Sequence, residues 1–102
     1  MRYISTRGEA PILNFPDALL AGLARDGGLY VPETWPVLSP EVIAGLSGQP
    51  YAEVAKVVLA PFVDGAIETQ AFHRMIDEAY ATFRHPAVTP LVQLSSSEWV
   101  LE

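Results

Sequence analysis

Residues 25–32 place the strongest constraint on how this chain folds; they read Arg-Asp-Gly-Gly-Leu-Tyr-Val-Pro. A helical pattern runs into this stretch, and a glycine pair can end a helix because glycine readily adopts the left-handed conformation. The residues that follow favour an extended strand, which Pro32 stops or marks as an edge. We therefore expect a strand at about residues 29–31 that pairs with a strand near residues 2–6. The remaining elements are expected to pack around this small β unit.

Four helices are indicated by apolar residues that recur at helical spacing. They are expected at about residues 16–24, 40–46, 51–62 and 69–83. In the first helix, Leu19, Leu20 and Leu23 are expected to form the buried face, and a glycine at 27–28 to end it. Pro61 is expected to end or kink the third helix, because proline disfavours the helical conformation of the residue before it.

The last part of the chain has the pattern of a β-hairpin. Two apolar segments, about residues 91–94 and 99–101, are joined by a polar turn at 95–98, as in two short antiparallel strands. A natural domain seldom ends directly after a strand, so the end at Glu102 is interpreted as a truncation. Together these elements predict an α+β fold that is predominantly helical.

Composition excludes several classes of protein. The net charge is −6 and the six basic residues are scattered, which leaves little for a nucleic-acid backbone to bind. There is no cysteine, no signal-peptide pattern and no apolar run long enough for a membrane span. We therefore expect a soluble cytoplasmic protein with no nucleic-acid or membrane partner. Half of the residues are apolar, which suggests that some apolar surface is meant for a partner.

The sequence offers no complete catalytic or metal site. His73 and Asp77 lie four residues apart on a predicted helix, but no third ligand stands at metal spacing, so a solvated face is the expected role. Lys56 is the only lysine and is expected on the surface of the third helix. We therefore expect no catalytic, cofactor-binding or metal-binding residue in this chain.

Ser5, Thr6 and Arg7 are the weak candidates for a substrate site. Two hydroxyls and a guanidinium at the end of a strand can hold an anion such as a phosphate ester. Short runs of this kind are also common in ordinary turns, which is the favoured interpretation on sequence grounds.

Several segments in this order resemble the N-terminal region of threonine synthase, and the resemblance covers essentially the whole chain. The matching segments are residues 3–8 (Tyr-Ile-Ser-Thr-Arg-Gly), 26–32 (Asp-Gly-Gly-Leu-Tyr-Val-Pro), 75–80 (Met-Ile-Asp-Glu-Ala-Tyr), 83–86 (Phe-Arg-His-Pro), 90–94 (Pro-Leu-Val-Gln-Leu) and 99–102 (Trp-Val-Leu-Glu).

The resemblance implies the N-terminal part of a fold-type-II enzyme that uses pyridoxal phosphate. Threonine synthases convert O-phosphohomoserine and water to threonine and phosphate. Their cofactor lysine lies in a His-Gly-Pro-Thr…Phe-Lys segment shortly after a strand resembling residues 99–102, so it is expected beyond Glu102. The implied division is a threonine-synthase-like N-terminal domain at 1–85 and the first strands of the cofactor domain at 86–102.

The fragment itself is then expected to be inactive, with a structural or substrate-gating role and the rest of the enzyme chain as its partner. Its hairpin edge also suggests self-association. The alternative from another class is a stand-alone interaction module that binds a partner through the strand edge at 91–101. The two interpretations differ in whether the reading frame continues toward a Phe-Lys segment.

Overall fold

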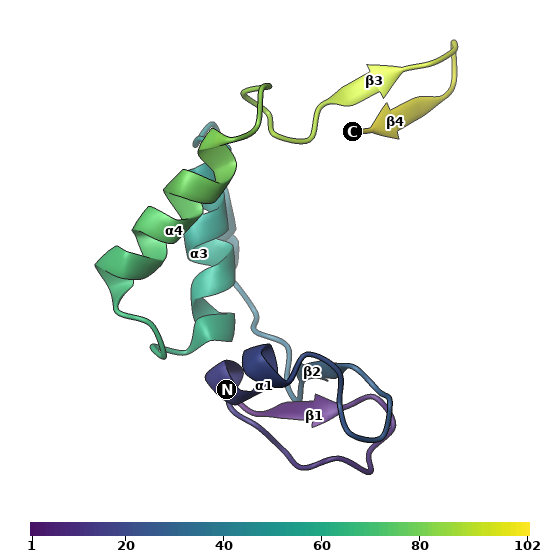
Figure 1. Cartoon of the computed structure of the whole chain (residues 1–102). Helices are drawn as coiled ribbons and strands as arrows, with labels where there is room; N and C mark the ends of the chain where they lie inside the picture. Colours follow the sequence, from purple (N-terminus) through teal and green to yellow (C-terminus); the bar gives the residue numbers. More distant parts are fainter.

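A computed structural model describes all residues, 1–102, and contains four helices and two small antiparallel sheets (Figure 1). The elements in chain order are β1 (Tyr3–Ser5), α1 (Phe15–Ala21), β2 (Tyr30–Pro32), α2 (Pro40–Gly45), α3 (Tyr51–Val63), α4 (Thr69–Ala81), β3 (Leu91–Gln93) and β4 (Trp99–Leu101). This architecture confirms the predicted α+β class, and each helix and strand lies within a few residues of its expected place.

The β1–β2 pair confirms the pairing predicted between the N-terminus and the segment after the glycine pair. The strands are antiparallel, with Tyr3 opposite Pro32 and Ser5 opposite Tyr30. Tyr3 also forms an isolated bridge with Leu13, so the chain before α1 lies on the other side of β1. β1 is therefore held from both sides although it is only three residues long.

Helix α1 ends earlier than the sequence predicts. Asn14 caps its first turn by accepting a hydrogen bond from the Asp17 amide, at 2.9 Å. Gly22 ends the helix with a φ of 66°, so the predicted extension to residue 24 and the predicted cap at 27–28 are both wrong. The helix stops at the first glycine it meets, because glycine adopts a positive φ without steric cost.

The predicted buried face of α1 is also wrong. Leu19, Leu20 and Leu23 are 66%, 85% and 67% exposed, and Ala18 is the buried residue of this helix. The small Ala18 side chain faces the β unit, and no other element of the chain covers the leucines. Leu23 lies beyond the end of α1, and spacing alone does not say what covers an apolar face.

Helices α3 and α4 pack against each other as a helical hairpin. At one end, the rings of Tyr51 and Tyr80 meet edge to face with centroids 4.8 Å apart. Along the interface, Lys56 of α3 reaches across to Asp77 of α4, with the two charged atoms 2.8 Å apart. The Lys56 side chain is only 11% exposed, so the prediction of a surface lysine is wrong. Its stem is covered because the residue faces the partner helix.

Pro61 lies inside α3 without ending it. The helix continues to Val63, and Asp64 ends it in the left-handed conformation with a φ of 51°. Proline cannot donate the hydrogen bond to the carbonyl four residues earlier, but this costs the helix a single bond, and the helix ends only two residues later.

The β unit and the helical hairpin are joined by a narrow contact. The Tyr3 hydroxyl donates to the backbone carbonyl of Phe62 at 2.6 Å, and the Trp35 ring packs edge-on against the Phe62 ring with centroids 6.0 Å apart. The N-terminal ammonium group pairs with Asp64 at the same place. These contacts link β1 to the end of α3.

The chain as a whole is extended. Its radius of gyration is 16.7 Å, against about 13 Å for a compact domain of this length. Its accessible surface is 7435 Å², against roughly 5,700 Å² for a compact protein of this mass. The β3–β4 hairpin stands apart from the helices (Figure 1). The expectation that every element packs around the β unit is therefore wrong.

Replacing Tyr3 by Phe is expected to lower the free energy of unfolding by about 1 kcal/mol, because the part-buried carbonyl of Phe62 loses its donor. Urea denaturation followed by circular dichroism measures this change. Tyr30→Phe is the matched control, since the Tyr30 hydroxyl makes an exposed bond to Pro11, and it should change stability by less than about 0.5 kcal/mol. Equal effects of the two substitutions would contradict the role given to Tyr3.

Candidate functional site

The carboxylate of Asp26 organises the turn that contains the predicted site residues. Its Oδ1 atom accepts hydrogen bonds from the Ser5 hydroxyl at 2.8 Å and from the Gly28 amide at 2.9 Å. Its Oδ2 atom accepts from the Glu9 amide at 2.9 Å. One side chain therefore joins β1, the turn that follows β1 and the turn that precedes β2.

Ser5, Thr6 and Arg7 are brought together around Asp26. The Arg7 side chain donates through Nη1 to the Asp26 backbone carbonyl at 2.8 Å, and the Arg7 amide donates to the Ser5 hydroxyl oxygen at 3.2 Å. The Thr6 hydroxyl oxygen accepts from the Leu29 amide at 3.0 Å. All three predicted residues thus hold the turn itself.

The same hydrogen bonds set the charge of this cluster. The bond from the Gly28 amide, supported by those from the Ser5 hydroxyl and the Glu9 amide, lowers the pKa of Asp26, and partial desolvation opposes this effect. Hydrogen bonds to the ionised form favour that form. Asp26 is therefore a carboxylate at neutral pH, and its negative charge lies at the centre of the turn.

Only part of the predicted anion site remains available for a ligand. The Ser5 hydroxyl is buried and already donates its proton to Asp26. Arg7 is exposed and makes one side-chain hydrogen bond, so several of its five donors face solvent. The Thr6 hydroxyl proton has no partner within the chain. Arg7 and Thr6 can thus contribute to anion binding, whereas Asp26 opposes it.

Gly28 is required because the backbone of this turn approaches β1 closely. A Cβ atom built on Gly28 would lie 2.3 Å from Ser5 Oγ and 3.0 Å from Thr6 Oγ1. The glycine pair therefore divides its roles: Gly27 has a positive φ of 78°, and Gly28 leaves space. Asp26 was missed by sequence reasoning, although an aspartate two residues before a glycine amide is a known turn signal.

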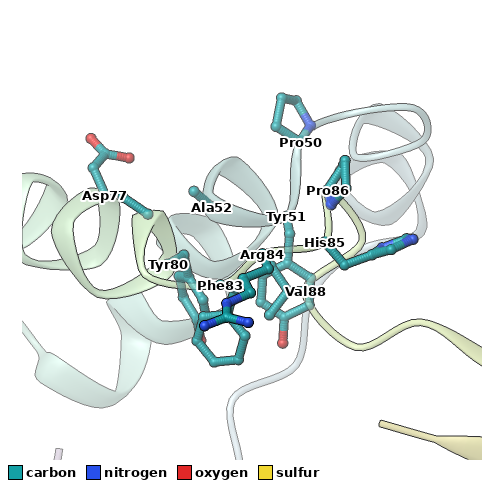
Figure 2. A pocket seen from close by; sticks show the side chains of 11 residues that line it. Pro50, Tyr51, Ala52, Asp77, Tyr80, Phe83, Arg84, His85, Pro86 and Val88 are labelled. Atoms are coloured by element: carbon teal, nitrogen blue, oxygen red, sulfur yellow. The ribbon is translucent and has the colours of Figure 1, made fainter.

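The largest cavity lies elsewhere, between the start of α3 and the end of α4 (Figure 2). It has a volume of about 400 Å³ and is bordered by the rings of Tyr51, Tyr80 and Phe83, with Arg84 and His85 at its edge. The Tyr80 and Phe83 rings are 5.7 Å apart. Burial among these groups raises the pKa of Tyr80. The cavity is thus an open aromatic groove.

This groove holds no pair of groups suited to acid–base or nucleophilic catalysis. Asp77 is bound to Lys56. The Nδ1 atom of His85 accepts a hydrogen bond from the Ala87 amide at 3.1 Å, which occupies one ring nitrogen locally. His73 has no hydrogen-bond partner, and no three histidine, aspartate or glutamate side chains gather at metal-binding distance.

The chain is thus a small α+β structure whose polar residues hold turns and helices in place. Comparison with known proteins identifies its family. The family model described as "Threonine synthase N terminus" matches residues 2–80. The chain belongs to this family and is similar over its whole length to the N-terminal part of threonine synthases.

Individual relatives agree with the family match. The chain is 58% identical to threonine synthase of Pseudomonas aeruginosa over 102 residues, and these residues are 22% of that protein. A crystal structure of threonine synthase from Brucella melitensis with bound pyridoxal phosphate matches 100% of the chain and 22% of its own, with 60% identity and a TM-score of 0.89. The yeast enzyme matches 91% of the chain and 19% of its own, at 32% identity and a TM-score of 0.80.

The chain therefore spans about a fifth of the length of the relatives it matches. These comparisons give no support to the alternative of a stand-alone interaction module. None of the four helices is long and apolar enough to cross a membrane.

The residues of this chain do not fit the covalent binding of pyridoxal phosphate. That bond requires an unprotonated lysine amine. Lys56, the only lysine, places its Nζ atom 2.8 Å from Asp77 and 2.7 Å from Glu53. The hydrogen bonds from Lys56 to Asp77 and Glu53 raise the pKa of the lysine, so it remains protonated and occupied.

Replacing Gly28 by Ala is expected to lower the free energy of unfolding by about 1–3 kcal/mol, because the new methyl group collides with Ser5 and Thr6. Gly45→Ala is the control: Gly45 lies in helix α2 with open space around it, and alanine should stabilise the helix by about 0.5–1 kcal/mol. Denaturant titration of both variants measures the difference. A neutral Gly28→Ala variant would show that the close approach does not constrain the turn.

Proposed function

We propose that this chain is the N-terminal portion of a cytoplasmic threonine synthase, which converts O-phosphohomoserine and water to threonine and phosphate with pyridoxal phosphate. The observation that carries this proposal is the 58% identity with the Pseudomonas aeruginosa enzyme across all 102 residues, which form 22% of that enzyme. The reaction belongs to threonine biosynthesis. The cofactor and the small-molecule substrate would be bound by the complete protein.

Within that enzyme we assign this portion a structural or substrate-gating role, without activity of its own. The assignment is supported by the ion pairs that occupy Lys56 and by the lack of a nucleophile–base pair in the aromatic groove. Large exposed apolar side chains on several elements, Leu20, Trp99 and Leu101 among them, fit a segment that packs against the rest of a longer chain.

We place the boundary between two structural units near residue 85. Residues 1–85 would form the N-terminal domain, because α4 ends at Ala81 and the family model matches residues 2–80. Residues 86–102 would begin the cofactor domain, with β3–β4 joining its larger sheet. Separated from that sheet, the free edge of the hairpin would favour self-association.

The direct test of this proposal compares the 102-residue chain with the full-length protein in the presence of pyridoxal phosphate. The full-length protein is expected to show visible absorbance from bound cofactor and to release phosphate from O-phosphohomoserine. The isolated chain is expected to show neither, because its one lysine is engaged in two ion pairs. Cofactor absorbance from the isolated chain would contradict the assigned role.

Ser5, Thr6 and Arg7 complete the proposal as the part of this chain that approaches the phosphate end of the substrate. The support is local. The Arg7 guanidinium is exposed and has further donors that make no hydrogen bond within the chain, and the Thr6 hydroxyl can still donate a hydrogen bond. Ser5 would contribute by holding the turn and not by binding the phosphate itself, because its hydroxyl is bound to Asp26. An arginine is well suited to a phosphate group, since its planar donors match the phosphate oxygens.

In the full-length protein, Arg7→Ala is expected to raise KM for O-phosphohomoserine about tenfold, which is the loss of about 1.4 kcal/mol of binding, with kcat little changed. Arg25→Ala is the matched control, because Arg25 is an exposed arginine that makes no ion pair, and KM should stay the same. Steady-state kinetics of phosphate release gives both constants. An unchanged KM and kcat in Arg7→Ala would remove Arg7 from the substrate site.

A further inference from the structure

Four exposed leucines lie on α1 and in the segment that joins α1 to β2. Leu19 and Leu20 are neighbours near the end of α1, whereas Leu23 follows the Gly22 cap and forms an isolated antiparallel bridge with Leu29. The four side chains are 58–85% exposed. We call Leu19, Leu20, Leu23 and Leu29 the leucine surface.

A hollow adjoins the leucine surface. It has a volume of about 190 Å³ and lies between β1, α1 and β2, with Leu19 in its wall. The other lining residues are Tyr3, Phe15, Ala18, Gly22 and Tyr30. A projecting rim beside an apolar hollow is the shape that receives an apolar side chain from a partner.

No element of the chain is placed to cover this surface. The β3–β4 hairpin, which is another exposed apolar region, lies at the opposite end of the molecule from α1 (Figure 1). The net charge of −6 disfavours a surface of anionic lipids. A protein partner is therefore the fitting occupant.

The size of the surface selects among protein partners. Four side chains are too few to supply the roughly 800 Å² per partner that a standard interface between separate molecules buries. A covalently attached partner needs less area, because the connection gives it a high effective concentration. About four-fifths of the length of the relatives that match this chain lies outside the match. This additional length provides such a partner.

We propose that the leucine surface docks onto the remainder of the same polypeptide in the full-length protein, with an apolar side chain of that remainder seated in the hollow beside Leu19. This inference rests on the proposed function, which supplies the remainder. It makes α1 a second attachment point in addition to the β3–β4 hairpin. This chain would then be fixed to the larger part of the enzyme near both of its ends.

The test is hydrogen exchange of full-length protein carrying Leu20→Glu. Docking buries Leu20, so a charge there should loosen the contact and raise the exchange rates of α1 amides about tenfold or more. Val37→Glu is the control, because Val37 is 92% exposed in the loop between β2 and α2 and is not one of the four leucines, and exchange in α1 should stay as in the parent. Leu20→Ala, which keeps the helix and adds no charge, should give a smaller increase in the same amides.

The outcomes distinguish this proposal from the proposed function. Unchanged exchange of α1 in both Leu20 variants would overturn docking even if the full-length protein makes threonine. If the α1 amides are protected only at high protein concentration, and ultracentrifugation shows a dimer at the same concentration, docking onto the same polypeptide would be overturned. The occupant of the leucine surface would then be a second copy of the protein. Loss of α1 protection in Leu20→Glu would support docking even if the parent protein proved inactive on O-phosphohomoserine.

Discussion

The N-terminal half of this structure depends on the hydrogen bonds that the Asp26 carboxylate accepts. Strands of three residues are only marginally stable as an isolated pair, and β1 and β2 are both of that length. Asp26 adds three hydrogen bonds from different parts of the turn region. These bonds fix the turn, the turn fixes β1, and β1 carries Tyr3 to the carbonyl of Phe62.

The rest of the structure follows from how little apolar surface this chain covers on its own. Nine of 102 residues are buried, and no large side chain is completely buried. The helical hairpin is held by a small number of buried residues, Ala55 and Ile76 among them, by one aromatic contact at its end and by the ion pair between Lys56 and Asp77. Exposed apolar surface of this extent agrees with the proposal that the chain packs against the rest of a longer protein, since its relatives are about five times longer.

Local patterns in the sequence were sufficient to predict the approximate places of the elements and the β1–β2 pairing, because turns and helical spacing are encoded by neighbouring residues. The end of α1 at Gly22 is also a local signal, but it was missed. The sequence failed where the answer depended on distant parts of the chain. Leu19, Leu20 and Leu23 have the spacing of a buried face, but burial requires a covering element that this chain does not provide. Lys56 looked like a surface residue because Asp77 is distant in sequence.

The candidate site shows the same division. Ser5, Thr6 and Arg7 were identified as a polar cluster from their own chemistry, and they do lie together. Their organiser, Asp26, was not identified, because its bonds to Ser5 and Glu9 cross about twenty residues of sequence. Its bond to the Gly28 amide is local and could have been recognised as a turn signal.

The most direct test of this account is the pKa of Asp26, measured by carboxyl chemical shifts in an NMR titration. Three donors bind its ionised form, so the account predicts a pKa below that of an ordinary aspartate. Because the folded pKa is lowered, the stabilising contribution is present above the unfolded pKa and is lost as the pH falls through the folded pKa. A pKa at or above the ordinary value would show that the carboxylate does not hold the turn.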